Sequence, residues 1–401
     1  MKIIMVLKEF PPNIVGGLGI HGFEISKALV RNGKEVHVIT PHVERAESNE
    51  LVRGIDVKRI KFPNLKWLDK ILFKESIQRL GDFEEFFLNI ISFNLQTYNE
   101  IIKLTSEYAD NYIVHAHDWL GIIAGVMAKK ELGIPLVVTY HSTEYGRSMG
   151  SGIQEIKDIE AIGAREADMI ITVSEHMKEE LKMLGYPEEK INVVYNGIDE
   201  KKYDYRIDGG EIRRRYGIKE NERLVFFVGR LERVKGVEYL VLSIPKIIEK
   251  FPNTKFLILG IGGMQDYIKK MVENLKISGN VIMVNEFVSE EERIKFYAAS
   301  DICIFPSLYE PFGIVALEAM AMKKPVIVGK TGGLQEIVIH EKTGLHVRPG
   351  NSDDIANAII ELLSDEKKMI QFGEEGRKRV EENFTWDKIA MKTIEVYQKL
   401  L

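Results

Sequence analysis

The sequence predicts an α/β protein with two doubly wound domains, each a parallel sheet covered by helices. Short apolar runs rich in β-branched residues alternate with amphipathic stretches along nearly the whole chain, a pattern typical of parallel sheets. The chain has 401 residues, more than one ordinary hydrophobic core accommodates, because domains commonly hold about 150 residues. The alternation also breaks once near the middle of the chain, which favours two domains over one.

The first half of the chain contains a series of expected strands separated by helical stretches. A helix is expected over residues 21–32, where Phe23, Ala28 and Leu29 fall on one side and Gly33 can cap the end. The expected strands span residues 2–7, 35–40, 112–115, 136–140, 169–173 and 191–195.

The pattern breaks at residues 196–217, which we interpret as the linker between the domains. Two glycine-containing pairs, Asn196-Gly197 and Gly209-Gly210, stand there among clustered charges. A second series of strands is then expected at residues 224–228, 255–259, 281–284, 302–305, 325–328 and 345–347.

Composition excludes several classes of protein. The 55 basic and 60 acidic residues leave a net charge of −5, which gives no electrostatic reason to expect nucleic-acid binding. Cys303 is the only cysteine, so no internal disulfide or cysteine-based zinc site can form, and a cytoplasmic location fits. No signal peptide is visible, and no stretch approaches the roughly 20 apolar residues that span a bilayer.

The residues that follow each strand are the candidate site, because ligands of open α/β sheets bind beyond the carboxyl ends of the strands. After the first strand, Gly16 and Gly17 begin a glycine-rich turn whose backbone N–H groups can bind an anion. Gly17, Gly19 and Gly22 also match the G-x-G-x-x-G dinucleotide fingerprint, but its acidic partner is missing, so NAD is disfavoured. A tight turn without a ligand remains the competing interpretation.

Histidines follow the third and fourth strands. His115 and His117 share one strand face, so a metal site with His141 or Asp118 is an open alternative that would suit a metal-dependent hydrolase. Hydrogen-bonded histidines at strand ends are the plainer interpretation, above all for His115. His117, Asp118 and His141 lie nearer the expected ligand and are candidate substrate-binding or catalytic residues.

The second half supplies the cations. Arg230 and Lys235 bracket the turn after the strand at residues 224–228. They can bind a diphosphate, Arg230 as a bidentate fork and Lys235 as a point charge. Two solvated surface charges are the plainer alternative.

The most informative segment follows the strand at residues 302–305. There Pro311 and Gly313 open a helix, and Glu310 and Glu318 place carboxylates suited to sugar hydroxyls beside its start. The backbone amides that would point at a phosphate belong to Phe312, Gly313, Ile314 and Val315. The positive charges of Arg230 and Lys235 would offset the negative charges of these two carboxylates.

Together these residues resemble the retaining glycosyltransferases of the GT-B type, in particular the glycogen and starch synthase group of families 4 and 5. The resemblance covers nearly the full chain. Its most specific part is Glu310 and Glu318 with seven residues between them, inside Pro-Ser-Leu-Tyr-Glu-Pro-Phe-Gly-Ile-Val-Ala-Leu-Glu-Ala-Met. The segments Gly229-Arg230, Lys235-Gly236, Asn196-Gly197-Ile198-Asp199 and Thr331-Gly-Gly-Leu agree with the same pattern.

The resemblance implies two Rossmann-like domains facing each other across a cleft, and sugar transfer from a nucleotide-diphosphate sugar with retention at the anomeric carbon. It assigns Arg230 and Lys235 to the leaving diphosphate and Glu310 to the donor sugar's hydroxyls. It assigns Glu318 to the ribose, His141 to the side of the sugar, and Asp118 to the sugar hydroxyls or the acceptor. The amides of residues 312–315, with Gly16 and Gly17, would contact phosphates.

Because the last helix of such proteins crosses back to the first domain, the expected N-terminal domain is residues 1–205 plus 385–401. The C-terminal, nucleotide-sugar-binding domain is then residues 206–384. The chain has no Asp-x-Asp motif, so no metal and no cofactor beyond the donor substrate is expected.

The leading hypothesis is transfer of glucose from ADP- or UDP-glucose to the non-reducing end of an α-1,4-glucan, as in a glycogen synthase. The alternative is a transferase acting on a lipid or small molecule; a metal-dependent hydrolase and a non-catalytic nucleotide-sugar-binding protein are less favoured. Residues 58–74 mix basic and apolar side chains and can be interpreted as a peripheral membrane contact or, more plainly, as a solvated helix. The expected partners are a nucleotide sugar and a carbohydrate acceptor, with no nucleic acid.

Overall fold

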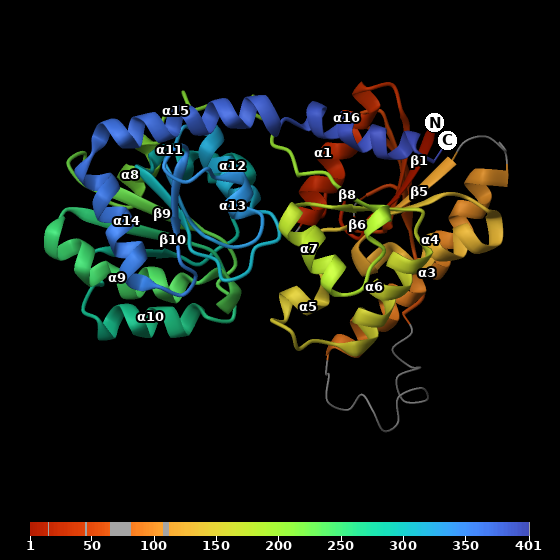
Figure 1. Ribbon diagram of the computed structural model, residues 1–401, viewed down its shortest axis with the longest axis horizontal. Helices are drawn as coiled ribbons and strands as arrows, with labels where there is room; N and C mark the ends of the chain where they lie inside the picture. Colours follow the sequence, from red (N-terminus) through yellow and green to blue (C-terminus); the bar gives the residue numbers. More distant parts are fainter. Residues whose placement is uncertain (15, 45, 65–81, 107–111, 401) are drawn as a thin grey trace. The chain divides into compact units, whose positions relative to one another are not determined.

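The computed structural model describes residues 1–14, 16–44, 46–64, 82–106 and 112–400, which form two compact units (Figure 1). The first unit comprises Met1–Val173, Met177–Gly197 and Trp386–Leu401, and the second comprises Ser174–His176 and Ile198–Thr385. The boundary predicted at 205/206 thus lies at 197/198. The reason is that Ile198 pairs with Thr385, and Tyr203 donates a hydrogen bond to Glu318, both inside the second unit.

An eight-stranded sheet with the order β3-β4-β2-β1-β5-β6-β7-β8 forms the centre of the first unit. Its parallel strands predicted from the sequence are β1 (Lys2–Val6), β2 (Glu35–Pro41), β5 (Tyr112–His117), β6 (Leu136–Tyr140), β7 (Met169–Thr172) and β8 (Ile191–Val193). Since β1 lies between β2 and β5, the chain crosses over at β1, and ligands of such sheets bind beyond the strand ends at that crossover.

The prediction missed two strands, β3 (Asn49–Val52) and β4 (Ile55–Ile60). Strand β4 is parallel to β2 and antiparallel to β3, so the two form a hairpin at the edge of the sheet. Residues 58–60 therefore end a strand instead of beginning a basic amphipathic segment. The remainder of that segment, from residue 65 onward, lies outside the described residues.

Helices cover this sheet, and α16 (Trp386–Gln398) returns from the second unit to pack against α1 (Gly17–Arg31). The other helices described in this unit are α3 (Asp82–Ser106), α4 (Asp118–Leu132), α5 (Glu144–Arg147), α6 (Gln154–Glu166) and, from Met177 onward, α7 (Glu175–Met183), with a short turn η2 (Glu188–Lys190). Trp386 and Ile389 share a hydrophobic cluster with Ile3 and Met5 of β1, which attaches the returning helix to the core.

The second unit has six strands in a parallel sheet, as the sequence predicts, and their order is β11-β10-β9-β12-β13-β14. The strands are β9 (Arg223–Val228), β10 (Thr254–Leu259), β11 (Val281–Val284), β12 (Ile302–Phe305), β13 (Val326–Gly329) and β14 (Gly344–Val347). The helices are α8 (Gly210–Arg215), α9 (Val237–Lys250), α10 (Gln265–Asn274), α11 (Glu290–Ala299), α12 (Ile314–Ala321), α13 (Leu334–Ile337), α14 (Ser352–Ser364) and α15 (Glu366–Asn383), with a short turn η3 (Arg233–Lys235).

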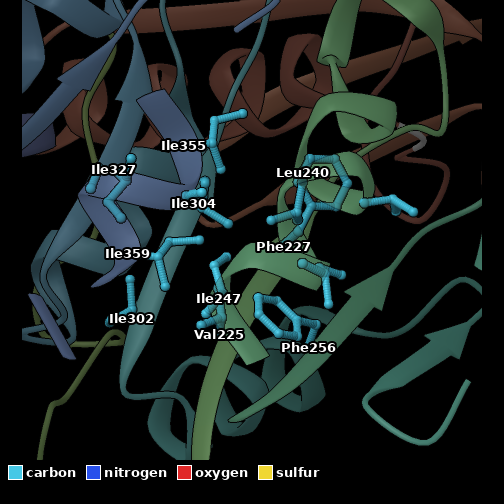
Figure 2. Packing of buried hydrophobic residues seen from close by; sticks show 14 of the residues in the cluster. Val225, Phe227, Leu240, Ile247, Phe256, Ile302, Ile304, Ile327, Ile355 and Ile359 are labelled. Atoms are coloured by element: carbon cyan, nitrogen blue, oxygen red, sulfur yellow. The ribbon is translucent and has the colours of Figure 1, made fainter. Parts of the chain in front are cut away.

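A core of β-branched and aromatic side chains holds this sheet against α9 and α14 (Figure 2). Phe227 of β9 and Phe256 of β10 pack with Leu240 of α9, and Ile304 of β12 lies near Ile355 of α14. Burying each such side chain contributes about 1.5–3 kcal/mol, so this cluster fixes the positions of the strand ends from which the site loops leave. Within the described helices, none is long and apolar enough to cross a membrane.

Candidate active site

Two loops at the carboxyl ends of the second unit's strands depend on glycine for their close contact. Gly236 follows η3 with φ +65°, and a Cβ there would clash with the Pro306 carbonyl oxygen in the loop after β12. Gly332 follows β13 with φ +50°, and a Cβ there would clash with the carbonyl oxygen of Glu310. Only glycine accommodates both the left-handed backbone and the contact, so these loops meet at one place.

This contact brings Lys235 and Glu310 together. Lys235 Nζ lies 2.5 Å from Glu310 Oε2, and Ser307 Oγ donates to the same oxygen over 3.3 Å. Glu310 is 8% exposed, so the ion pair is shielded from bulk water on most sides. The predicted cation and the predicted hydroxyl-binding carboxylate therefore stand side by side.

Arg230 occupies the same loop immediately after β9. Its side chain is exposed, and the described residues offer it no ion pair. Two positive groups, one engaged and one free for a ligand, thus project from the turn that follows β9.

Helix α12 begins in the next loop, at Ile314, with Gly313 as its N-cap and no acidic residue in its first turn. The backbone N–H groups of a first helical turn have no partner inside the helix, so the start of α12 can bind an anion. Phe312 precedes it and is buried, which anchors the loop.

Glu318 lies in the second turn of α12 and is 3% exposed. Its Oε1 accepts from Tyr203 (2.7 Å) and Arg293 Nη2 (2.9 Å), and its Oε2 accepts from Tyr297 (2.7 Å) and Arg293 Nε (3.1 Å). A carboxylate has about four lone-pair positions, and all of them are used here. Ribose binding by Glu318 requires one of these donors to leave, and that role stays a prediction.

In the first unit, imidazoles gather where β5 and β6 end and α1 begins. His117 Nδ1 and His141 Nε2 share a hydrogen bond of 3.0 Å, and the His21 ring lies 4.5 Å from the His141 ring between centroids. His115 contacts the Thr139 hydroxyl and the Tyr397 hydroxyl, each at 2.6 Å, as the plainer interpretation predicts.

Burial keeps these rings neutral. It lowers the pKa of His141 to about 3 and holds the pKa values of His21, His115 and His117 well below the ordinary value. His117 Nε2 and His21 Nδ1 are buried without a hydrogen-bond partner among the described residues. The amide of Asn196 interacts with the His21 ring, but its Oδ1 also lacks a hydrogen bond of good geometry there. Buried polar atoms are usually hydrogen-bonded, so a ligand or a water molecule has hydrogen-bonding groups to meet at this place.

Asp118 joins the ends of β5 and β6. It begins α4 with φ +53°, an uncommon conformation for a residue other than glycine, and its Oδ1 accepts from His141 N over 2.7 Å. Burial raises the pKa of Asp118 to about 6, and the positive charge of Arg147 offsets part of that shift. Asp118 therefore positions the backbone that carries His141.

Arg147 and Glu160 form a second polar cluster beyond β6. Arg147 donates to Ser142 Oγ at 2.6 Å and lies 3.1 Å from Glu144 and 3.3 Å from Glu160. Burial raises the pKa of Glu160 to about 7, although Arg147 lowers it. The prediction missed this cluster, although Glu144 and Arg147 follow a strand end and the same rule would have found them.

Gly16 and Gly17 open α1, as expected for the glycine-rich turn. The Gly16 N–H, however, donates to Glu9 Oε2 at 3.1 Å, so in this structure it is not directed at a phosphate. The phosphate contacts of Gly16 and Gly17 stay predictions.

Comparisons with known proteins identify the family to which the chain belongs. The family described as Glycosyltransferase Family 4 matches residues 15–202, and the family described as Glycosyl transferases group 1 matches residues 208–379. An uncharacterized glycosyltransferase of Methanocaldococcus jannaschii is 36% identical over 99% of this chain and 98% of its own length. The chain is a glycosyltransferase with the GT-B fold, similar to the glycogen synthases.

Other relatives of this glycosyltransferase differ in what they are named for. A glycogen synthase of Mycobacterium tuberculosis is 30% identical over 99% of this chain and 94% of its own length. An N-acetyl-alpha-D-glucosaminyl L-malate synthase of Bacillus anthracis is 29% identical over 100% of this chain and 98% of its own length. The sucrose-phosphate synthase of Thermosynechococcus elongatus superposes with a TM-score of 0.79 at 25% identity, covering 100% of this chain and 98% of that chain.

The predicted site residues of this glycosyltransferase fall into one group in each unit. The group in the second unit is Arg230, Lys235, Glu310, Phe312, Gly313, Ile314, Val315 and Glu318. The group in the first unit is Gly16, Gly17, His117, Asp118 and His141. Sequence analysis missed Arg293, Tyr203 and Tyr297, which no spacing links to the motifs, and His21, which lies inside the glycine-rich segment.

Proposed function

We propose that this glycosyltransferase moves glucose from ADP- or UDP-glucose to the non-reducing end of an α-1,4-glucan, with retention at the anomeric carbon. The observation that carries the proposal is the Lys235–Glu310 pair, with Arg230 exposed on the same turn. A diphosphate needs cations, a sugar needs a hydroxyl-binding carboxylate, and this place offers both. The relative named glycogen synthase supports the glucan acceptor.

In the proposed reaction, Arg230 and Lys235 stabilise the negative charge that develops on the leaving diphosphate. Charges placed in advance where a transition state becomes negative are commonly the largest catalytic contribution. Lys235 is held by Glu310 before any ligand arrives, so little reorganisation is needed. Because these cations come from the chain itself, the proposal includes no metal ion.

Glu310 accepts hydrogen bonds from the donor sugar's hydroxyls, and the N-terminus of α12 receives a phosphate. His141 is neutral and therefore serves as a hydrogen-bonding group toward the sugar and not as a charge. Retention follows in this proposal from attack on the same face that the diphosphate leaves, which requires no covalent nucleophile. A cytoplasmic location belongs to the same proposal.

A lipid or small-molecule acceptor is the second candidate. It is favoured by the Bacillus anthracis relative, whose name gives malate as the acceptor. The donor-side residues are the same in both cases, so the two candidates differ only in the acceptor.

The test is release of nucleotide from ADP-glucose and from UDP-glucose, each with and without glycogen, in the presence of EDTA. The proposal predicts glycogen-dependent release from at least one donor, undiminished by EDTA. Release that needs a small acceptor such as malate would support the second candidate. If EDTA abolishes nucleotide release, the proposal that Arg230 and Lys235 neutralise the diphosphate without a metal ion is wrong.

A further inference from the structure

Three imidazoles in the first unit surround one point. One ring nitrogen from each of His21, His117 and His141 lies within 4.8 Å of the other two. The residues come from three different elements, since His21 belongs to α1, His117 ends β5 and His141 follows β6. The backbones of the three histidines are thus held in place by the sheet and by the helix α1.

The cluster lacks partners that its burial demands. His117 is 1% exposed and His21 is 6% exposed, and Nε2 of the first and Nδ1 of the second have no hydrogen-bond partner in the described chain. Leaving a buried polar atom unpaired costs about 1–3 kcal/mol, so an occupant that reaches His21 Nδ1 is favoured. His117 would bind the same occupant through Nδ1, which it shares with His141, so its unpaired Nε2 is not counted as a ligand atom.

We propose that His21, His117 and His141 form a binding site for a divalent transition-metal ion such as Zn²⁺. Three imidazoles with a fourth position open form a common zinc ligand set, and imidazole favours such ions over Mg²⁺ and Ca²⁺.

The distances suit this occupant after a small movement. His117 Nδ1 and His141 Nε2 are 3.0 Å apart, close to the roughly 3.4 Å between two ligands of one tetrahedral zinc ion. The ion takes the place of the proton that these two rings share, and the His21 side chain rotates inward to complete the set.

The charges around the cluster are mixed. Asp118 supplies a carboxylate, since its Oδ1 accepts from the backbone of His141, and it compensates part of the ion's charge. Arg147, which interacts electrostatically with Asp118, is the opposing cation, and Glu144 and Glu160 pair with it. Of these groups, Asp118 is the carboxylate that contacts a residue of the cluster, through the His141 backbone, so it is the one that offsets part of the ion's charge.

Metal binding has a functional consequence that rests on the proposed function. His141 faces the donor sugar there, so an ion held by the same ring competes with the donor. The site is therefore inhibitory: Zn²⁺ should raise the apparent KM for the donor and leave kcat unchanged at saturating donor.

The direct test is titration of the chelator-treated full chain with Zn²⁺ by calorimetry, and with Co²⁺ by visible absorption. One ion should bind per chain, and Mg²⁺ should not bind. The variants His21→Ala and His21→Asn, checked for folding by circular dichroism, should each lose at least tenfold in affinity. His346→Ala, in the two-imidazole pair His340–His346, is the matched control and should bind as the parent does.

Absence of stoichiometric Zn²⁺ binding overturns the proposal, as does unchanged affinity in a folded His21 variant. If the His346 control loses as much Zn²⁺ affinity as the His21 variants, the ion does not bind specifically at the cluster, and the proposal is overturned as well. If the protein binds Zn²⁺ but transfers no sugar, the metal site stands and the proposed function fails. If it transfers sugar and Zn²⁺ binds without raising the donor KM, the competition is wrong.

Discussion

At the scale of single residues, Glu318 and Arg293 show how strongly the second unit relies on one buried charge pair. The Arg293 side chain is 15% exposed and the Glu318 side chain 4% exposed, and two tyrosine hydroxyls complete the carboxylate's hydrogen bonds. Removing one partner of a buried pair leaves the other charge without compensation, which is strongly destabilising.

Glu318→Gln should therefore lower the free energy of unfolding by roughly 3 kcal/mol, measured by urea denaturation. The matched control is Glu292→Gln, which breaks the ion pair of Glu292 with Arg215 on the surface of the same unit. That change should stay within about 0.5 kcal/mol, because exposed pairs contribute little. If both substitutions lower the free energy of unfolding by the same amount, the buried pair of Glu318 and Arg293 does not have the stabilising role described.

Glu160 gives a prediction about pH. Burial raises its pKa from 4.5 to about 7, so the folded state binds a proton that the unfolded state has lost between these values. The stability from this group is complete below about pH 4.5 and is lost as pH rises through about 7. The buried histidines act in the opposite direction, since their lowered pKa values give stability that is lost as pH falls below about 6.5.

Glu160→Gln isolates the first effect, because the histidines remain in both proteins. The free energy of unfolding of the variant minus that of the parent should increase from pH 5 to pH 8, by on the order of 3 kcal/mol at most. Urea denaturation at both values measures it. A difference that is constant or decreases over this interval would show that Glu160 is charged when folded at pH 5.

That Lys235 and Glu310 lie in one group could be predicted, because both belong to loops that follow strands of one parallel sheet. The role of Tyr203 could not, since it acts on Glu318 from 115 positions away in the chain. His21 was also missed, because its position in a glycine-rich helix start directed attention to the backbone and away from the side chain.

At the scale of elements, the loop after β13 is set by Gly332. Its left-handed backbone lets Gly333 N donate to the Glu310 carbonyl over 3.0 Å, and this fixes the segment that carries the Glu310 carboxylate. Gly332→Ala adds a methyl group against that carbonyl in a conformation that alanine disfavours.

We expect Gly332→Ala to lower the free energy of unfolding by more than about 2 kcal/mol and to reduce turnover as well. Gly279→Ala is the control, because a Cβ there meets no atom within 4 Å and its φ is not in the left-handed region. Thermal unfolding of both variants measures the difference. A melting temperature of Gly332→Ala that equals that of the control would contradict the loop contact.

Central strands that the sequence revealed, such as β5 and β6, are buried on both faces, whereas the missed β4 shows the alternation buried, partly exposed, buried. Ile55 and Val57 are fully buried, and Asp56 and Lys58 between them carry charge. A period of two over so few residues is a weak signal beside the long apolar runs of a parallel sheet.

At the scale of the whole molecule, each unit has its own sheet and its own group of site residues. The chain passes from the first unit to the second at 197/198 and returns at 385/386. The break in strand periodicity predicted that there would be two units. It could not give the residue at which the chain enters the second unit, because Tyr203 stands in a sequence typical of a charged linker and is nevertheless buried in the second unit.

The central claim is that Arg230 and Lys235 act on the leaving diphosphate and thereby on the transition state. Turnover and nucleotide affinity should respond differently to their removal, because stabilisation confined to the transition state changes kcat more than ground-state binding. Lys246→Ala, which removes the exposed partner of Asp353 in the same unit, provides a matched lysine control.

The most direct measurement is therefore kcat for glucosyl transfer beside the dissociation constant of the nucleotide diphosphate, in the parent, Arg230→Ala, Lys235→Ala and Lys246→Ala. The account predicts that kcat falls roughly 100-fold or more in the first two variants, with a much smaller loss of affinity, and that Lys246→Ala matches the parent. Equal losses in kcat and affinity, or a Lys235→Ala variant as active as the control, would contradict it.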